Sequence, residues 1–227
     1  MKKAKVIRKV FMLLSIAIFC SVLTAGQASA STLTYFYDVE FSGGTEPQGT
    51  SPWLTATFDD NTGQANSVYL TMSADNLVGT EFVNDWYFNF DTALSPSLLT
   101  FSYVSGTAGA ADNILTGSDA FKADGDGNYD ILFDYTESTT GDRFTSGETA
   151  TYEIFYTSPI DVSSFNYFSY EGGGQGSYLA AAKVQAINYN EDLSGFVGVV
   201  PEPVSSTLFI IGGATLGFRR FRRKFKK

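Results

Sequence analysis

The feature that most constrains the fold is an alternation of apolar and polar residues with a period of two, which recurs along residues 31–200. Apolar side chains at every second position face one side of a β-strand. Within 82–90, for example, Phe82, Trp86 and Phe88 are expected to share one face, with Asn84 as the exception. The expected strands are Leu33–Phe41, Leu54–Phe58, Ser67–Ser73, Phe82–Phe90, Leu98–Val104, Tyr129–Tyr135, Thr149–Tyr156, Ser164–Tyr170, Tyr178–Ile187 and Gly195–Val199.

The segments between these strands are rich in Gly, Asp, Asn and Ser, which are turn residues. Short strands that follow one another without helical periods predict an all-β domain, a single antiparallel β-sandwich or jelly roll. Only Ser118–Ala123 and Leu179–Lys183 favour a helical turn. A chain of this length buries enough apolar surface for one core, so we expect one ectodomain over residues 31–198.

Charge divides the chain into three parts. Residues 1–30 hold five basic residues, residues 219–227 hold seven, and residues 31–200 hold 3 basic against 23 acidic residues, a net charge of −20. The middle part contains no Cys and no His, which excludes disulfides, Cys or His metal ligands, and Ser-His-Asp or Cys-His nucleophile pairs there. Nucleic acid is excluded as a partner, because its phosphates need clustered Lys and Arg.

The N-terminus has the pattern of a signal peptide. A basic stretch, Met1–Lys9, precedes an apolar stretch, Val10–Leu23. Small residues at Ala28 and Ala30 then provide a signal-peptidase site, and we expect cleavage after Ala30. The only cysteine, Cys20, would leave with the peptide, so the mature protein would fold outside the cytoplasm without a thiol.

The C-terminal residues 199–227 have the pattern of a membrane tail with three parts. Pro201, Glu202 and Pro203 precede the uncharged segment Val204–Phe218, which predicts a short transmembrane helix. A basic cluster at the cytoplasmic end would orient the acidic middle part outward. The cluster comprises Arg219, Arg220, Arg222, Arg223, Lys224, Lys226 and Lys227.

This tail resembles the PEP-CTERM protein-sorting signal, through Val200–Pro203, the short apolar segment and the Arg-rich end. The resemblance covers residues 200–227 and implies that the protein is a substrate of exosortase, a membrane protease of Gram-negative bacteria that make exopolysaccharide. It implies cleavage near Pro201–Pro203, a transient stay in the inner membrane, and release to the cell surface or matrix. Residues Phe121–Gly127 are also similar to a recurrent ectodomain of such proteins, one without an established activity.

A cluster of oxygen-bearing residues follows that motif. Asp124, Asp126, Asn128 and Asp130 alternate on a Gly-containing segment, where their oxygens could converge on Ca²⁺. The segment begins like an EF-hand loop, but Tyr129 stands where Gly is required and no flanking helices are evident. The alternative interpretation is an ordinary acidic turn.

The many aromatic residues offer a second candidate site. Trp53 and Tyr87 are expected to be exposed and to stack on sugar rings, whereas most other aromatics would pack in the core. Paired carboxylates, such as two of Asp85, Glu148 and Glu153, would allow glycosidase chemistry, but no motif joins them. We therefore expect a non-enzymatic structural or adhesive surface protein. The alternatives are a Ca²⁺-assisted module that binds exopolysaccharide and, less favoured, a glycosidase.

Overall fold

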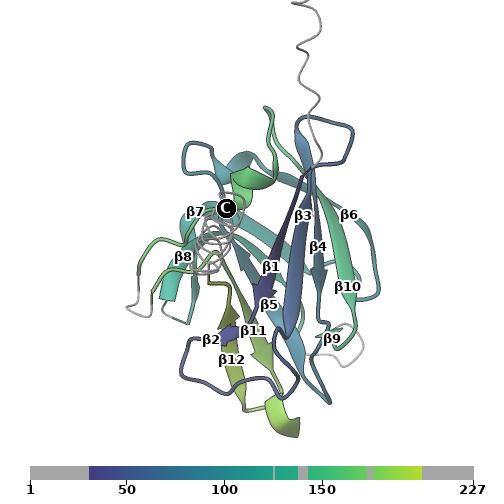
Figure 1. Cartoon of the computed structure of the whole chain (residues 1–227), viewed down its shortest axis with the longest axis vertical. Coiled ribbons are helices and arrows are strands. Elements are labelled where there is room, and N and C mark those ends of the chain that lie inside the picture. Colours follow the sequence, from purple (N-terminus) through teal and green to yellow (C-terminus); the bar gives the residue numbers. More distant parts are fainter. Residues whose placement is uncertain (1–30, 125, 138–142, 173–175, 201–227) are drawn as a thin grey trace, which may run out of the picture. The chain divides into compact units, whose positions relative to one another are not determined.

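The structure, a computed structural model, describes residues 31–200 except 125, 138–142 and 173–175 (Figure 1). The expected all-β fold is confirmed for this part of the chain. Three short 3₁₀ turns connect its strands, η1 (Pro96–Leu98), η2 (Val162–Phe165) and η3 (Ile187–Tyr189). The strands are β1 (Thr32–Tyr37), β2 (Val39–Glu40), β3 (Leu54–Asp59), β4 (Ser67–Ser73), β5 (Phe82–Phe88), β6 (Thr100–Gly106), β7 (Asn113–Ala123), β8 (Asp126–Asp134), β9 (Phe144–Thr145), β10 (Thr149–Phe155), β11 (Ala180–Gln185) and β12 (Ser194–Gly198).

The strands form two antiparallel sheets. The five-stranded sheet has the order β1-β3-β4-β10-β6, and the second sheet has the order β2-β12-β11-β5-β8-β7, with β9 paired to β5. Neighbouring strands in these orders are often distant in sequence, as with β4 and β10, so most of the pairing is long-range. Figure 1 shows strands β1, β3, β4 and β10 running side by side in the first sheet.

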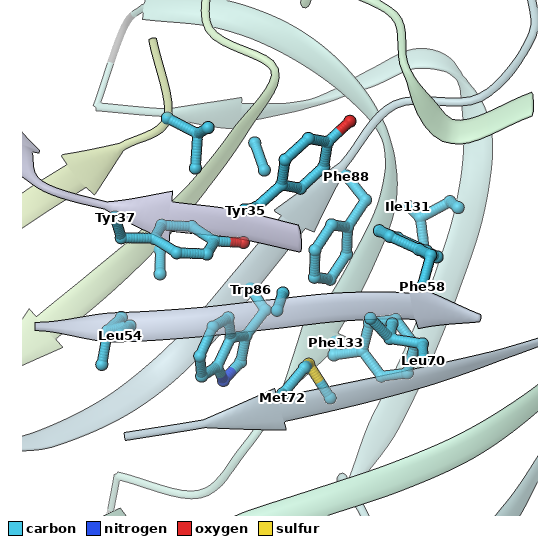
Figure 2. Packing of buried hydrophobic residues seen from close by; sticks show 14 of the residues in the cluster. Tyr35, Tyr37, Leu54, Phe58, Leu70, Met72, Trp86, Phe88, Ile131 and Phe133 are labelled. Carbon is cyan, nitrogen blue, oxygen red and sulfur yellow. The ribbon is translucent and has the colours of Figure 1, made fainter. Parts of the chain in front are cut away.

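The main core lies between the two sheets, because the inward residues of both sheets belong to one buried cluster. Figure 2 shows side chains of β1, β3 and β4 packed against those of β5 and β8. The Phe58 ring stacks on Phe165, with 4.5 Å between the ring centres, and meets Phe88 edge-on at 5.5 Å. This two-sided packing agrees with a sandwich-like arrangement and leaves each sheet with an outer face.

Three expectations of local structure are wrong. Ser118–Ala123 and Leu179–Lys183, where a helical turn was favoured, lie mainly in strands β7 and β11, and the strand expected at Tyr178–Ile187 is thereby confirmed. Ser164–Tyr170, expected as a strand, contains the end of η2 and only a single bridge between Tyr170 and Asn128. Strand β7 was not expected from the sequence, because most of its side chains are exposed. Residues 117–120 also bulge out opposite Asp130, which breaks the alternation of apolar and polar residues.

A second bulge reverses the faces of β5. The register pairs Asp85 with Lys183 and Val83 with Val184, so Asn84 is the extra residue. Val83 therefore packs in the main core together with Trp86, whereas Phe82 lies outside that cluster. The expectation that Phe82 shares the face of Trp86 is wrong for this reason.

Candidate functional site

The outer face of the five-stranded sheet carries a line of aligned hydroxyl groups. The strand register places Thr34, Thr57, Thr71 and Thr151 directly opposite one another across β1, β3, β4 and β10, and Ser105 of β6 continues the line. Directly opposed residues of antiparallel strands present their side chains on the same face. The hydroxyl oxygens of Thr34 and Thr57 are 3.1 Å apart, and those of Thr71 and Thr151 are 3.0 Å apart. We call these four residues the threonine row.

A line of larger polar side chains runs beside the threonine row. Asp59, Tyr69 and Glu153 are aligned by the same register, and all three are partly exposed. One oxygen of the Glu153 carboxylate accepts a hydrogen bond from the Ser67 hydroxyl at 3.0 Å. The Asp59 carboxylate accepts one from the backbone amide of Asn61 at 2.8 Å. Hydrogen-bond acceptors and an aromatic ring thus lie next to the threonine hydroxyls.

A bulge in β6 turns this face into a shallow groove. The register pairs Ser105 with Thr151 and Tyr103 with Tyr152, which leaves Val104 as the extra residue. Val104 is 49% exposed and contributes to the wall of the groove. Bulges commonly re-aim a side chain beside a functional site. The groove has a volume of about 480 Å³ and is lined by Thr57, Asp59, Tyr69, Thr71, Val104 and Thr151.

The lining determines which ligands the groove suits. Threonine hydroxyls donate and accept hydrogen bonds, whereas an ionised carboxylate only accepts them. The only charged lining residue is Asp59, and the described domain is strongly acidic. An anionic ligand would therefore be repelled. Most of the lining surface is apolar, so the groove suits an uncharged ligand that presents C–H groups as well as hydroxyl groups.

This face could not be predicted from the sequence. The available signal was the repeated Thr-x-Thr pattern of 32–34, 55–57 and 149–151, with the threonines opposite the inward positions. The pattern predicts the outward side of each strand, but it does not tell which strands are neighbours or how they are aligned. Only the register brings Thr57, Thr71 and Thr151 together.

The structure describes the side chains of three of the four residues of the expected calcium loop, Asp124, Asn128 and Asp130. Asp124 lies in the turn before β8, with a left-handed φ of 45°. Asn128 exchanges two backbone hydrogen bonds with Tyr170, at 2.8 and 3.0 Å. Among the described residues, no group of three or more acidic side chains could hold a metal ion. The Asp126 side chain lies outside the described part.

The fourth proposed ligand, Asp130, has a structural role. Its Oδ2 accepts a hydrogen bond from the amide of Phe90 at 2.9 Å, and its Oδ1 accepts one from the amide of Asp119 at 2.8 Å. The carboxylate thus ties the end of β5 to the bulge of β7. Burial raises the pKa of Asp130 above its usual value, and the two hydrogen bonds partly oppose that increase.

The expected exposure of the two stacking aromatics is wrong. Trp53 is 4% exposed and belongs to the main core, and its indole N–H donates to the carbonyl of Gly49 at 2.9 Å. Tyr87 is 5% exposed and belongs to a second apolar cluster with Phe41 and Tyr178. Neither side chain offers a free ring face. The alternation predicted that Tyr87 faces away from Trp86, but not that other aromatics cover it.

The carboxylates considered for glycosidase chemistry lie in different places. Asp85 is in β5, whereas Glu153 lies on the outer face of the other sheet. Glu148 accepts hydrogen bonds from the amide and the hydroxyl of Thr145, so it stabilises the turn before β10. The nearest acidic neighbour of Asp85 across the sheet is Asp134, directly opposite on β8.

The terminal sorting elements lie outside the described residues. These are Ala28, Ala30, Pro201, Glu202, Pro203, Arg219, Arg220, Arg222 and Arg223. Within the part of the chain that the structure describes, no helix is long and apolar enough to cross a membrane. Comparisons of the chain with protein-family models, with curated proteins and with solved structures found no match.

Proposed function

We propose that this chain is an exported, non-enzymatic adhesive or structural protein of the cell surface or matrix, which binds an uncharged polysaccharide on the outer face of its five-stranded sheet. The observation that carries the proposal is the groove floored by Thr57, Thr71 and Thr151. Aligned hydroxyls suit a ligand that itself carries hydroxyl groups at regular intervals, as a polysaccharide does. The groove is open and shallow, which suits an extended chain that passes along the sheet.

The charge of the domain supports an uncharged ligand. Residues 31–200 carry a net charge of −20, and Lys122, Arg143 and Lys183 are their only basic residues. Arg143 and Lys183 are engaged with Glu191 and Glu137 in ion pairs of 3.1 and 3.3 Å. An acidic polysaccharide would meet like charge at the groove, so a neutral one is favoured. Direct hydrogen bonds from this lining need no bridging Ca²⁺.

The terminal sequences support the proposed location. By its resemblance to a PEP-CTERM signal, the tail would be removed near Pro201–Pro203 by exosortase after signal peptidase has cut at Ala30. Mass spectrometry of the protein from the cell surface tests this route. A mature C-terminus near Pro203 supports it, whereas an intact Arg-rich end on the surface protein would overturn it.

Isosteric variants test the groove. We would titrate the full-length chain, purified in mild detergent, calorimetrically with soluble neutral polysaccharides. Exchanging both Thr71 and Thr151 for Val keeps the shape and strand propensity but removes two hydroxyls that each contribute about 1 kcal/mol to binding. The double variant should therefore bind about thirtyfold more weakly. Thr149→Val, on the same face but outside the groove lining, is the control and should leave affinity unchanged.

A further variant distinguishes the charge class of the ligand. Asp59→Asn should weaken binding of a neutral polysaccharide, because it removes a carboxylate acceptor from the groove. The same change should strengthen binding of an anionic polysaccharide, because it removes repulsion. Binding that is unaffected by all three groove changes would overturn the assignment of this face.

A further inference from the structure

The loop between β11 and β12 is held in an unusual backbone conformation. Ala186, Asn188 and Tyr189 have left-handed φ values of 54°, 56° and 57°. Left-handed geometry is disfavoured for residues with a Cβ, and a short run of three such residues must be compensated by the surrounding structure. Conformations of this kind cluster at sites that bind ligands.

The strained loop presents Tyr189 to solvent. Its side chain is 76% exposed, more than that of Tyr170 at 64%. The ring rests against the backbone of Gly79, because a Cβ at that glycine would lie 2.8 Å from the Tyr189 Cζ atom. Gly79 also has a φ of 65°, which favours glycine. One part of the ring is thus supported by backbone, while most of the side chain faces solvent. We call Tyr189 and Gly79 the tyrosine platform.

Contacts on both sides hold the platform in place. Ile187 is fully buried in the main core, and the Thr80 hydroxyl donates a hydrogen bond to the Ala186 carbonyl at 3.0 Å. The loop is also closed internally, since the amide of Asn190 donates to the Ile187 carbonyl at 3.1 Å. A loop backbone that is already fixed loses little conformational entropy when a ligand stacks on the tyrosine that it carries.

An ion pair adds a further restraint. Arg143 pairs with Glu191 at 3.1 Å, two residues after Tyr189. Arg143 is itself fixed by two hydrogen bonds to the Glu137 carbonyl, at 3.0 and 2.6 Å, and by the Phe82 ring beneath it. The loop that carries the platform is therefore held by residues in or next to β5, β8 and β9 of the same sheet, as well as by its own internal hydrogen bond.

We infer that the tyrosine platform is a second binding position, on which a pyranose ring of an uncharged polysaccharide stacks. The exposed ring is flanked in sequence by Asn188, Asn190 and Asp192, all exposed, whose amide and carboxylate groups suit the hydroxyls around a sugar ring. A proline-rich peptide, the other common partner of exposed aromatics, needs a groove lined by several of them. The inference shares its ligand class with the proposed function, but it concerns a different surface.

Calorimetric titration of the full-length chain with neutral hexasaccharides of glucose, xylose, mannose and N-acetylglucosamine tests the platform. Tyr189→Ala should lower the affinity for whichever hexasaccharide binds by about tenfold or more. Tyr189→Phe should retain that affinity, because the aromatic ring remains. Gly79→Ala should also weaken binding, because the new methyl group displaces the ring. Tyr170→Ala, which removes another exposed tyrosine, is the matched control.

The outcomes separate the platform from the groove. Loss of affinity in Tyr189→Ala but not in Tyr170→Ala, with unchanged unfolding midpoints, supports the inference. If only the Thr71 and Thr151 changes weaken binding, the platform is overturned and the groove stands. If no neutral hexasaccharide binds, both are overturned. Binding of decaproline that depends on Tyr189 would also overturn the inference, because it would assign the platform to a peptide.

Discussion

The guanidinium carbon of Arg143 lies 4.1 Å from the centre of the Phe82 ring. The contact is a consequence of the bulge at Asn84, which puts Phe82 on the side of β5 away from Trp86. Phe82 would otherwise be a large apolar side chain on an outer face, yet it is fully buried. One of the few basic residues of the acidic domain is thus used to cover an aromatic ring.

Removing Arg143 should destabilise the domain. Arg143→Ala loses a cation–π contact of about 0.5–1 kcal/mol and two hydrogen bonds to the Glu137 carbonyl of about 1 kcal/mol each. We expect the free energy of unfolding to fall by about 2–3 kcal/mol in urea denaturation. Arg143→Lys should recover little, because an ammonium group lacks the planar fork. Lys122→Ala, an exposed basic residue, is the control, and an equal loss there would contradict the argument.

The stacked pair of Phe58 and Phe165 should be a major contributor to core stability. Phe58 also packs edge-on against Tyr35 and Phe88, so its truncation leaves a cavity surrounded by rings that cannot easily collapse into it. Phe58→Ala should lower the free energy of unfolding by about 3–5 kcal/mol. Phe36→Ala is a suitable comparison, because Phe36 is exposed on the same sheet, and it should cost far less. Similar losses in the two variants would contradict the assigned core.

The pattern of strands could largely be predicted from sequence, because a strand buried on one side carries the alternation in its own residues. The expected strand Ser67–Ser73 matches β4 at both ends, and Thr149–Tyr156 differs from β10 by one residue. Strand β7 could not be found in this way, since it is mostly exposed and interrupted by a bulge. The reversal of the two faces of β5 at Asn84 could not be predicted either. The extra residue of a bulge is recognised only when the residues opposite it on the partner strand are known.

The candidate site was less predictable than the fold. Whether Tyr87 is exposed depends on Phe41 and Tyr178, which come from distant parts of the chain. The threonine row likewise exists only once the register of four strands is set. Sequence alternation predicts the side to which a residue points, but it does not predict what covers that side.

The carboxyl of Asp85 should make stability depend on pH. Burial raises its pKa above the usual 3.8, and Asp134 opposite adds to the increase, while the Tyr87 hydroxyl and Lys183 oppose it. A raised pKa in the folded state means that the folded protein holds the proton more tightly. This group therefore contributes stability that is present below about pH 3.8 and is lost as the pH rises through its folded-state pKa.

Asp85→Asn should remove that dependence. We expect the variant to be more stable than the parent at pH 7, and the difference in stability should shrink as the pH falls toward 4. Urea unfolding midpoints measured at intervals across this pH range test the expectation. Asp112→Asn is an exposed control and should leave the profile unchanged. A variant that is less stable than the parent at pH 7 would show that the contacts with Lys183 and Tyr87 outweigh the cost of burial.

Asp130 joins two parts of the second sheet, because its two carboxylate oxygens accept amide hydrogen bonds from Phe90, just after β5, and from Asp119 in β7. Asp130→Ala leaves the amides of Phe90 and Asp119 without this acceptor, so we expect a loss of about 2–4 kcal/mol in the free energy of unfolding. Because two backbone amides hold the carboxylate, we expect that EDTA leaves the unfolding midpoint of the parent protein unchanged. Asp112→Ala should cost almost nothing. A midpoint that rises with Ca²⁺ and no longer does so in Asp126→Ala would instead restore the metal loop, with Asp130 as one of its oxygen ligands.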